Sequence, residues 1–498
     1  MLSPRPARLT VLTALLLGAC SNPQTAADSN VAVAFQQRAA DPFAGGDFGA
    51  ASDSGTTGDS GTTGSADAAA DAALFASSTL SLQQAIDLVL QQNPGVEIAA
   101  ARIAQAATVV DENRAAFRPQ VNLDLGYMRA DAPSAYLFKT IDARGFVPGT
   151  DFNNPGAFNN WEAGIGVGYN LYSGGAHSLA GEVAQLQQRA AELGLSSLHN
   201  SLTAMTIDIW FAGLAAFEQQ QVAALSIQTV QAQLAETRIL FEEGKVLRSD
   251  VLSLQVRLAE AKEMAIRSGN GVKMARIALA SLLAVPESAM PALEVAAAEL
   301  PLVSVPADLA SALTAAFEQR PELEQLRVSL QQSELQVEQV AAGSKPSIDL
   351  FGRAWADNPD IDFAGSEANW NVGVAASWNL FDGGARSART ARAKAQMAEV
   401  QARHRALLSE VRQDVEFAYL ALGEASARLD VASGAVDLAL ESLRLVRAQY
   451  EEGVATVTRY LEAEQMATFA RQRLNQATFD RKRAAADLAR AMGVFAQS

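Results

Sequence analysis

Residues that could carry out chemistry are few in this chain of 498 residues. The three histidines, His177, His199 and His404, stand far apart and lack the spacing of metal ligands. Cys20 is the only cysteine, so the rest of the chain has no cysteine nucleophile and no disulfide framework. The run GIGVG at 164–168 lacks the GxGxxG spacing of a phosphate loop. We therefore expect no catalytic residue, no metal, no cofactor and no enzymatic activity.

The single cysteine stands at the end of a secretory signal. The first 20 residues carry Arg5 and Arg8, continue through an apolar core over 11–17, and finish at Cys20. This core is too short for a permanent membrane helix, which needs about 20 residues. The end of the segment resembles the lipobox of bacterial lipoproteins, which implies cleavage before Cys20 and acylation of its thiol. The alternative is a plain signal peptide with an incidental cysteine.

The composition narrows the class of protein. A formal net charge of −16 opposes contact with phosphate, so we do not expect nucleic-acid binding. After Cys20 there is no continuous apolar stretch of the roughly 18 residues expected of a membrane-spanning helix. If the chain crosses a membrane, it must therefore do so as strands.

Two copies of one pattern make up most of the chain. Pro94 corresponds to Pro321 at a shift of 227 residues, whereas Trp161 corresponds to Trp370 at a shift of 209. The difference of 18 residues indicates an insertion in the first copy, where 131–156 is predicted to be a longer surface loop. The expected domains are a lipoprotein signal peptide at 1–20, a disordered tether at 21–78, a first repeat at 79–285, a proline-rich linker at 286–307 and a second repeat at 308–498.

Each copy is predicted to run helix, strand, loop, strand, very long helix, second helix. Apolar residues alternate with polar or small ones over 161–171 and again over 370–380, which predicts strands with one apolar and one polar face. Their partners are 121–127 and 348–355, and the alternation of the last is blurred around Phe351. About ten residues is the length of a tilted membrane-spanning strand, and aromatic residues near the ends suit the membrane interfaces.

Four strands per chain are too few to stand alone in a membrane. A soluble β-sandwich is the alternative, but four strands scattered between helices cannot cover one another's apolar faces as seven do. Four strands also cannot close a barrel, and a sheet in lipid must have no open edge. Several chains must therefore share one barrel, with twelve strands from three chains or eight from two.

Rod-like helices follow the second strand of each copy. No proline interrupts 156–285 or the chain after Pro359, and the 68 residues of 176–243 would form a rod of roughly 100 Å. Gly244 and Gly453 can end the rods as C-caps, before returning helices of about 40 residues. Coiled-coil spacing predicts helix seams at Leu198, Leu202, Met205, Ile209, Ala212 and Ala216, and at Val436, Leu440, Leu443, Val446 and Tyr450.

With these features, the chain from about 79 to 498 resembles the TolC family of outer-membrane efflux proteins. The motifs that carry the resemblance are FEEGKVLRSDVL at 241–252 and YEEGVATVTRYL at 450–461, which look like the family's periplasmic tip turns. The resemblance implies a mainly α fold with membrane β-barrel strands, in which a trimer forms a 12-stranded barrel continued by an α-helical periplasmic tunnel. It also implies that the turns bind a periplasmic adaptor through Gly244, Lys245, Val246, Gly453, Val454 and Ala455. The alternative is a turn that merely needs glycine.

The resemblance further implies a ring of acidic residues that narrows the tunnel just beyond these turns. Asp250 matches one such position, and Glu462 falls where an aspartate often sits. Arg459 occupies a site that is frequently acidic in the family. We hypothesise that pairs of arginine with carboxylates hold this constriction; the alternative is ordinary solvated charge on the helix surface.

The leading function is the passive exit duct of a tripartite efflux system for drugs or other small toxic solutes, driven by an inner-membrane transporter through the adaptor. One alternative is the outer-membrane component of a type I protein secretion system, and another is a periplasmic coiled-coil adaptor or structural lipoprotein. Ser21 after Cys20 favours export to the Gram-negative outer membrane. The expected partners are two further copies of the chain, the adaptor, the transporter and outer-membrane lipid, which would hold the acylated chain as it extends into the periplasm.

Overall fold

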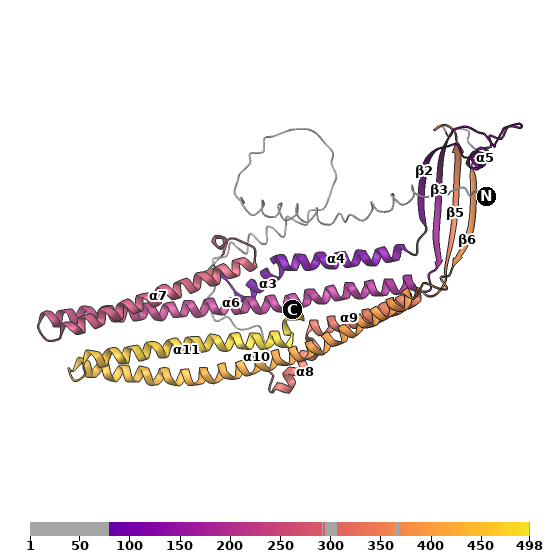
Figure 1. Ribbon diagram of the computed structural model, residues 1–498. Helices are drawn as coiled ribbons and strands as arrows, with labels where there is room; N and C mark the ends of the chain where they lie inside the picture. The colour runs from indigo at the N-terminus through magenta and orange to yellow at the C-terminus, as the bar shows by residue number, and fades with distance from the viewer. Residues whose placement is uncertain (1–78, 291, 294–305, 362, 364–367, 498) are drawn as a thin grey trace, which may run out of the picture. The chain divides into compact units, whose positions relative to one another are not determined.

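The computed structural model describes residues 79–290, 292–293, 306–361, 363 and 368–497. The predicted signal peptide, the tether and part of the linker lie outside the described residues. The described chain is mainly helical, and a four-stranded sheet stands at one end of the long helices (Figure 1). The elements are β1 (Thr79–Leu80), α3 (Leu82–Gln92), α4 (Pro94–Ala115), β2 (Gln120–Ala130), α5 (Pro133–Asp142), β3 (Phe158–Tyr172), α6 (Ala176–Glu242), α7 (Arg248–Leu282), η2 (Glu287–Ala289), β4 (Ala292–Leu293), α8 (Leu309–Gln319), α9 (Pro321–Ala342), β5 (Ser347–Asn358), β6 (Asn369–Ser377), α10 (Ala385–Glu451), α11 (Val457–Met492) and η3 (Val494–Gln497).

The elements repeat in the same order with almost the same lengths. Helices α3 and α8 each have 11 residues, α4 and α9 each have 22, and α6 and α10 each have 67. The returning helices α7 and α11 have 35 and 36 residues. The sequence boundaries proposed for the two repeats stay predictions.

Two details of the predicted order are wrong. The single helix expected ahead of each first strand is two helices, because Asn93 caps α4 with its side chain and Pro94 occupies the first turn of that helix. Arg320 and Pro321 divide α8 from α9 at the matching place. In addition, the stretch predicted to be a surface loop contains the helix α5, which also begins with a proline, Pro133.

The sheet is antiparallel in the order β2-β3-β5-β6, and neither β2 nor β6 has an outer partner within the described chain. Strand register places Leu123 opposite Ile165 on one face of the sheet. That face is apolar yet open, with Leu123 78% and Trp370 75% exposed. The sheet therefore presents a large apolar surface and two unpaired edges.

The register also explains why the alternation in β5 was hard to read. Phe351 and Trp355 project from the polar face of the sheet, where small residues make room for them. Phe351 lies directly over Gly373, and Trp355 lies against Gly164, where an added Cβ would come within 3.0 Å of the Trp355 Cβ. Gly164 of the run 164–168 thus has a structural reason unrelated to phosphate binding.

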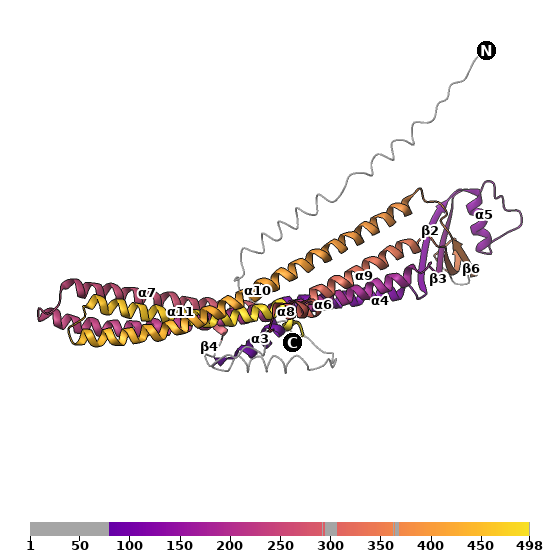
Figure 2. The same cartoon turned by 90° about the horizontal axis from the view of Figure 1, so that it is seen from below.

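The long helices lead from the sheet toward two distant turns (Figure 2). Gly174 and Gly175, with φ of 69° and 91°, turn the chain from β3 into α6, and Gly383 and Gly384 do the same before α10. Near the sheet α6 packs against α4 and α9, and farther along it packs against α7 and α11; α10 packs against α9 and α11. Among the described helices, none is both long and apolar enough to span a membrane.

The helical core lies where α3 and α6 meet the ends of α7 and α11. Ile207, Trp210 and Phe211 of α6 are fully buried there. The seam predicted for α6 is partly wrong, because Met205 is 49% exposed while Ile207 is buried. Helix α6 contacts several neighbours rather than one, so its buried face is wider than a single coiled-coil stripe.

An ion-pair cluster near this core joins α9, α10 and α11 of the second repeat. The Asp414 carboxylate on α10 accepts hydrogen bonds from Arg490 of α11 at 3.0 Å and from Arg320 at the start of α9 at 2.8 Å. Burial alone would raise the pKa of Asp414, but the hydrogen bonds and positive charges of the two arginines outweigh it and lower that pKa.

We expect Asp414→Asn to lower the free energy of unfolding at pH 7 by about 1 kcal/mol, since the group is partly exposed to solvent. Because the folded-state pKa is lowered, the charged form stabilises the fold above roughly pH 4, and this contribution is lost as the pH falls through the lowered pKa. Thermal unfolding followed by circular dichroism should show a difference between the two proteins at pH 7 that shrinks below about pH 3. An equal difference at both pH values would contradict this assignment.

Candidate functional site

The turns at the far ends of the long helices have the same geometry. Gly244 and Gly453 have φ of 74° and 73°, the left-handed conformation that glycine adopts without strain. The Gly244 amide donates to the Phe241 carbonyl at 2.9 Å, and the Lys245 amide donates to the Leu240 carbonyl at 2.8 Å. Both turns are thus Schellman motifs, which satisfy the last carbonyls of α6 and α10.

A cleft of about 810 Å³ lies between the two turns. Val246 is half-buried beside it, whereas Val454 does not line the cleft and is 78% exposed. The Lys245 ammonium pairs with Glu243 at 2.6 Å on the surface. Five of the six predicted adaptor-contact residues line this cleft, namely Gly244, Lys245, Val246, Gly453 and Ala455.

The three predicted constriction residues lie just past the turns, but they do not form one cluster. Asp250 caps α7, since its carboxylate accepts a hydrogen bond from the Leu247 amide at 3.1 Å. Arg459 pairs with Glu462 at 3.4 Å, one turn along α11, and both side chains are exposed. This pair of arginine and carboxylate lies within one helix rather than between helices. The role of all three residues in a constriction stays a prediction.

Two tyrosines beside the cleft belong to the site although the sequence reasoning did not propose them. Tyr450 and Tyr460 stack with ring centroids 5.4 Å apart, between the two helices that meet at the second turn. Burial raises the pKa of Tyr460, so its hydroxyl stays neutral at physiological pH. The signal was present in the motif 450–461, which begins with one tyrosine and includes the other.

A buried ion pair joins the two hairpins a short distance from the turns. Arg257 Nε of α7 donates to Glu464 Oε2 of α11 at 3.0 Å, and both side chains are buried. The other oxygen of Glu464 accepts from the hydroxyls of Ser226 on α6 at 3.1 Å and Thr468 on α11 at 2.9 Å. Charged residues are common on these helices, so nothing in the sequence singled out this pair.

We expect Arg257→Met to destabilise the closed packing of α7 on α11 by about 3–5 kcal/mol, because it leaves the Glu464 carboxylate buried without its cation. Hydrogen exchange of the amides around Glu464 should therefore become faster. Arg267→Ala on the same helix is the matched control, because its pair with Glu263 is exposed and contributes about 0–1 kcal/mol. Equal exchange in the two variants would show that the buried pair does not fasten the hairpins.

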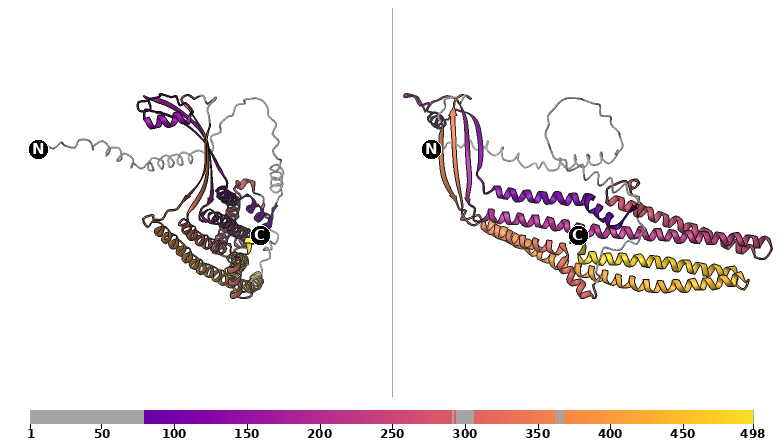
Figure 3. Two further views of the ribbon diagram at one scale, coloured as in Figure 1. Left: turned by 90° about the vertical axis from the view of Figure 1, so that its right-hand side faces the viewer. Right: turned by 180° about the vertical axis from the view of Figure 1, so that it is seen from behind.

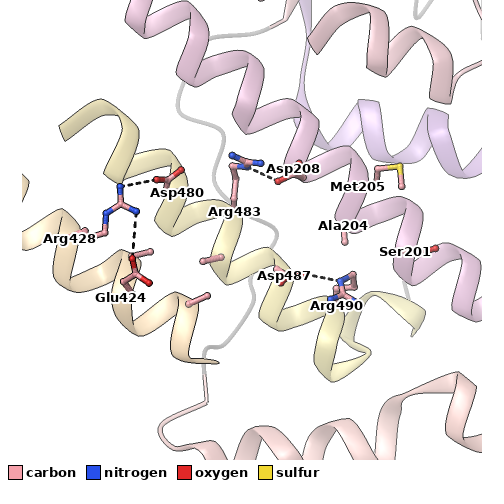
Figure 4. Close-up of a pocket in the computed structure, with 13 residues that line it drawn as sticks. Ser201, Ala204, Met205, Asp208, Glu424, Arg428, Asp480, Arg483, Asp487 and Arg490 are labelled. Carbon is pink, nitrogen blue, oxygen red and sulfur yellow. Dashed lines mark hydrogen bonds and ion pairs between the residues drawn. The ribbon is translucent and has the colours of Figure 1, made fainter. Parts of the chain in front are cut away.

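Nearer the middle of the helices, a cleft of about 510 Å³ lies between α6, α10 and α11 (Figure 4). Its charges are paired with one another: Arg483 with Asp208 at 2.6 Å, Arg428 with Asp480 at 3.5 Å, and Arg490 with Asp487 at 2.8 Å. The first two pairs join α11 to α6 and to α10, and the third lies within α11, so each of these charges already has a partner of opposite sign.

The histidines considered in the sequence have different surroundings. His177 packs edge-on against Phe117, with ring centroids 6.0 Å apart. His199 is half-buried, and burial lowers its pKa. Over the described residues, no group of three or more histidine, cysteine, aspartate or glutamate side chains could hold a metal ion. Cys20 lies outside the described residues.

Long paired helices that end in glycine turns, joined to a sheet with an open apolar face, define a protein built to span a membrane and extend beyond it. The chain belongs to the outer membrane efflux protein family, whose model matches residues 85–285 and 312–494. It is therefore a channel-type protein of the Gram-negative outer membrane and not an enzyme. The predicted resemblance is confirmed, and so is the predicted class of function, an efflux-type outer membrane channel.

Known relatives agree with this assignment. Protein CyaE of Bordetella pertussis is 28% identical over 404 residues, covering 79% of this chain and 80% of that protein. A membrane protein from Pseudomonas aeruginosa has a similar structure, with a TM-score of 0.72 and 18% identity over 83% of this chain and 91% of that one. The Campylobacter jejuni CmeC outer membrane channel gives a TM-score of 0.71 and 18% identity, covering 83% and 85% of the two chains.

Proposed function

We propose that three copies of this chain form the passive exit duct of a tripartite efflux system for drugs or other small toxic solutes. In this arrangement twelve strands close one barrel in the outer membrane, and the helices of the three copies form a tunnel into the periplasm. The observation that carries the proposal is the four-stranded sheet, which has an exposed apolar face and two edges that no other described strand pairs with.

The unpaired edges support an assembly of several copies. Backbone groups in lipid need hydrogen-bond partners, so β2 of one copy must pair with β6 of the next. Strands of 9–15 residues, as in β6 and β3, suit a tilted crossing of the membrane. Trp370 on the apolar face provides an aromatic residue near a strand end, as in the interfacial girdles of outer-membrane barrels.

The helices carry a second surface that supports the same assembly. Exposed apolar side chains follow α10, where Leu438 is 76% exposed, and others follow α7. Apolar patches of this extent on a soluble surface mark contacts with another protein. The exposed members are Phe417, Leu420, Val431, Leu438 and Leu445 on α10, and Leu252, Val256, Ile266, Met274 and Ile277 on α7. We assign both stripes to contacts between neighbouring copies.

The tip cleft is our candidate for the adaptor contact. Its two Schellman turns are exposed and have nearly equal backbone angles, so they can present backbone and side chains to helical hairpin tips of a partner. A periplasmic adaptor would connect these turns to an inner-membrane transporter. Acylation of Cys20, followed by the tether 21–78, would fix the chain to outer-membrane lipid.

Planar-bilayer recording of the purified Cys20→Ser protein tests the channel. We expect discrete conductance steps of uniform size, because each closed assembly would form one pore of fixed dimensions. A protein that shows no conductance and stays soluble without detergent would instead favour a periplasmic adaptor or structural lipoprotein.

The same recording tests the predicted constriction. Conductance of Arg459→Ala should be higher than that of the parent if Arg459 and Glu462 narrow the tunnel, and an unchanged value would remove this pair from the constriction.

Binding of a cognate periplasmic adaptor tests the tip. Gly453→Val forces a β-branched residue into left-handed backbone at the second turn, so we expect roughly tenfold weaker adaptor binding, measured by surface plasmon resonance. Gly434→Ala is the matched control, since Gly434 lies within α10 with open space around its Cβ position. Equal binding of the two variants would place the adaptor elsewhere.

A type I secretion system for polypeptides uses the same kind of duct and is the second candidate. The genes beside this one would distinguish the two functions. A proton-driven inner-membrane transporter would support efflux, and an ATP-binding exporter beside a secreted polypeptide would support secretion. Loss of dye efflux on deletion of the gene would support the first directly.

A further inference from the structure

Helix α5 is an element of the first repeat that has no counterpart among the described residues of the second. It lies between β2 and β3, whereas β5 and β6 are joined by a shorter connection. Figure 3 shows α5 at the end of the sheet that is farther from the long helices. In the proposed channel, this end faces the outside of the cell.

A single lysine ties α5 to two strands. The Lys139 ammonium donates to Glu162 of β3 and, at 2.9 Å, to Asp357 of β5. The same Asp357 oxygen accepts from the Asn160 amide at 2.7 Å, and Arg353 donates to Glu162. Two cations thus balance two carboxylates in one cluster.

The cluster lies on the polar face of the sheet. Register places Glu162 directly opposite Asp357, and the neighbouring residue Trp161 projects to the apolar face. The Asn369 side chain of β6 adds a second link on the same side, because it donates to the Asp142 carbonyl at the end of α5 at 3.0 Å. Helix α5 is therefore held over the polar face, which lines the interior of the proposed barrel.

The Lys139 contact is an anchor rather than a loose surface pair. The Asp357 side chain is fully buried, with 0% exposure, and one of its oxygens has no hydrogen-bond partner. A buried carboxylate without a cation is strongly disfavoured. Removal of the ammonium would therefore favour hydration of Asp357, which requires α5 to move away from the sheet.

The side of α5 away from this anchor is apolar and open. Phe138 is 65% exposed, and Ile141, one turn further on, is also exposed. In a closed three-copy barrel, a helix held on the interior face turns its free side toward the pore axis. The three copies of this apolar surface would then face one another across the outer mouth, where each covers part of the others.

Resting on the proposed function, we propose that α5 is a strap that limits the size of solutes passing the outer mouth, held in place by Lys139 between Glu162 and Asp357. The insertion thereby sets an outer size limit separate from the constriction at the periplasmic tips. We assign the apolar surface of α5 to contact with the same surface of α5 in the neighbouring copies.

Polymer exclusion in planar bilayers tests the strap. Polyethylene glycols of graded size are added to one chamber at a time, and the largest polymer that still lowers the conductance of the Cys20→Ser channel is recorded for each side. In Lys139→Ala we expect this limit to shift to larger polymers from one side only, with the limit from the other side unchanged. Lys139→Arg retains the cation and should stay close to the parent, and Lys273→Ala on α7 is the matched control.

Phe138→Ala provides a second variant, because this exposed side chain buries little surface within the protomer. It should shift the limit on the same side as Lys139→Ala. If Lys139→Ala forms no channels, an unchanged limit in Phe138→Ala overturns the strap. An unchanged limit in a conducting Lys139→Ala channel, or equal shifts from both sides, also overturns it. A parent protein without conductance would contradict the proposed function itself.

Discussion

Unpaired backbone at the two edges of a four-stranded sheet is the constraint on which the rest of this structure depends. Strands β2 and β6 have no outer partner in the described chain, and the apolar face beside them is open. In lipid, each unsatisfied backbone group costs several kcal/mol, so such a sheet is stable only when neighbouring chains complete it. The exposed apolar stripes along α7 and α10 likewise favour contact with neighbouring chains. Strands and helices thus point to one closed assembly of several copies.

The repeated order of elements gives each chain two similar halves, and some of its contacts occur in one half only. Equal helices of 67 residues bring both glycine turns to one cleft. The buried pair of Arg257 and Glu464 has no counterpart, because the repeat shift of 209 relates these positions to Met466 and Gln255. Lys139 lies in an insertion of the first repeat alone. The ion pair between the two hairpins and the proposed outer strap therefore each occur once per chain.

Local rules were enough to predict the strands, the rods and the turns, because period-two alternation, missing prolines and glycine positions are written in the sequence itself. Family membership of the chain also followed from those features. The buried stripe of α6 was only partly predicted, since Met205 is exposed and Ile207 buried in a helix that touches several neighbours. The contacts of Lys139 with Asp357 join residues far apart in the chain, so they depend on register between strands that no local pattern fixes.

Native mass spectrometry of the Cys20→Ser protein, released from detergent micelles, tests the central claim most directly. The account predicts a single species with three copies of the chain, because the open edges of β2 and β6 must be paired in a membrane. A stable monomer whose strands remain protected from hydrogen exchange would contradict it, since the sheet would then be complete without neighbours.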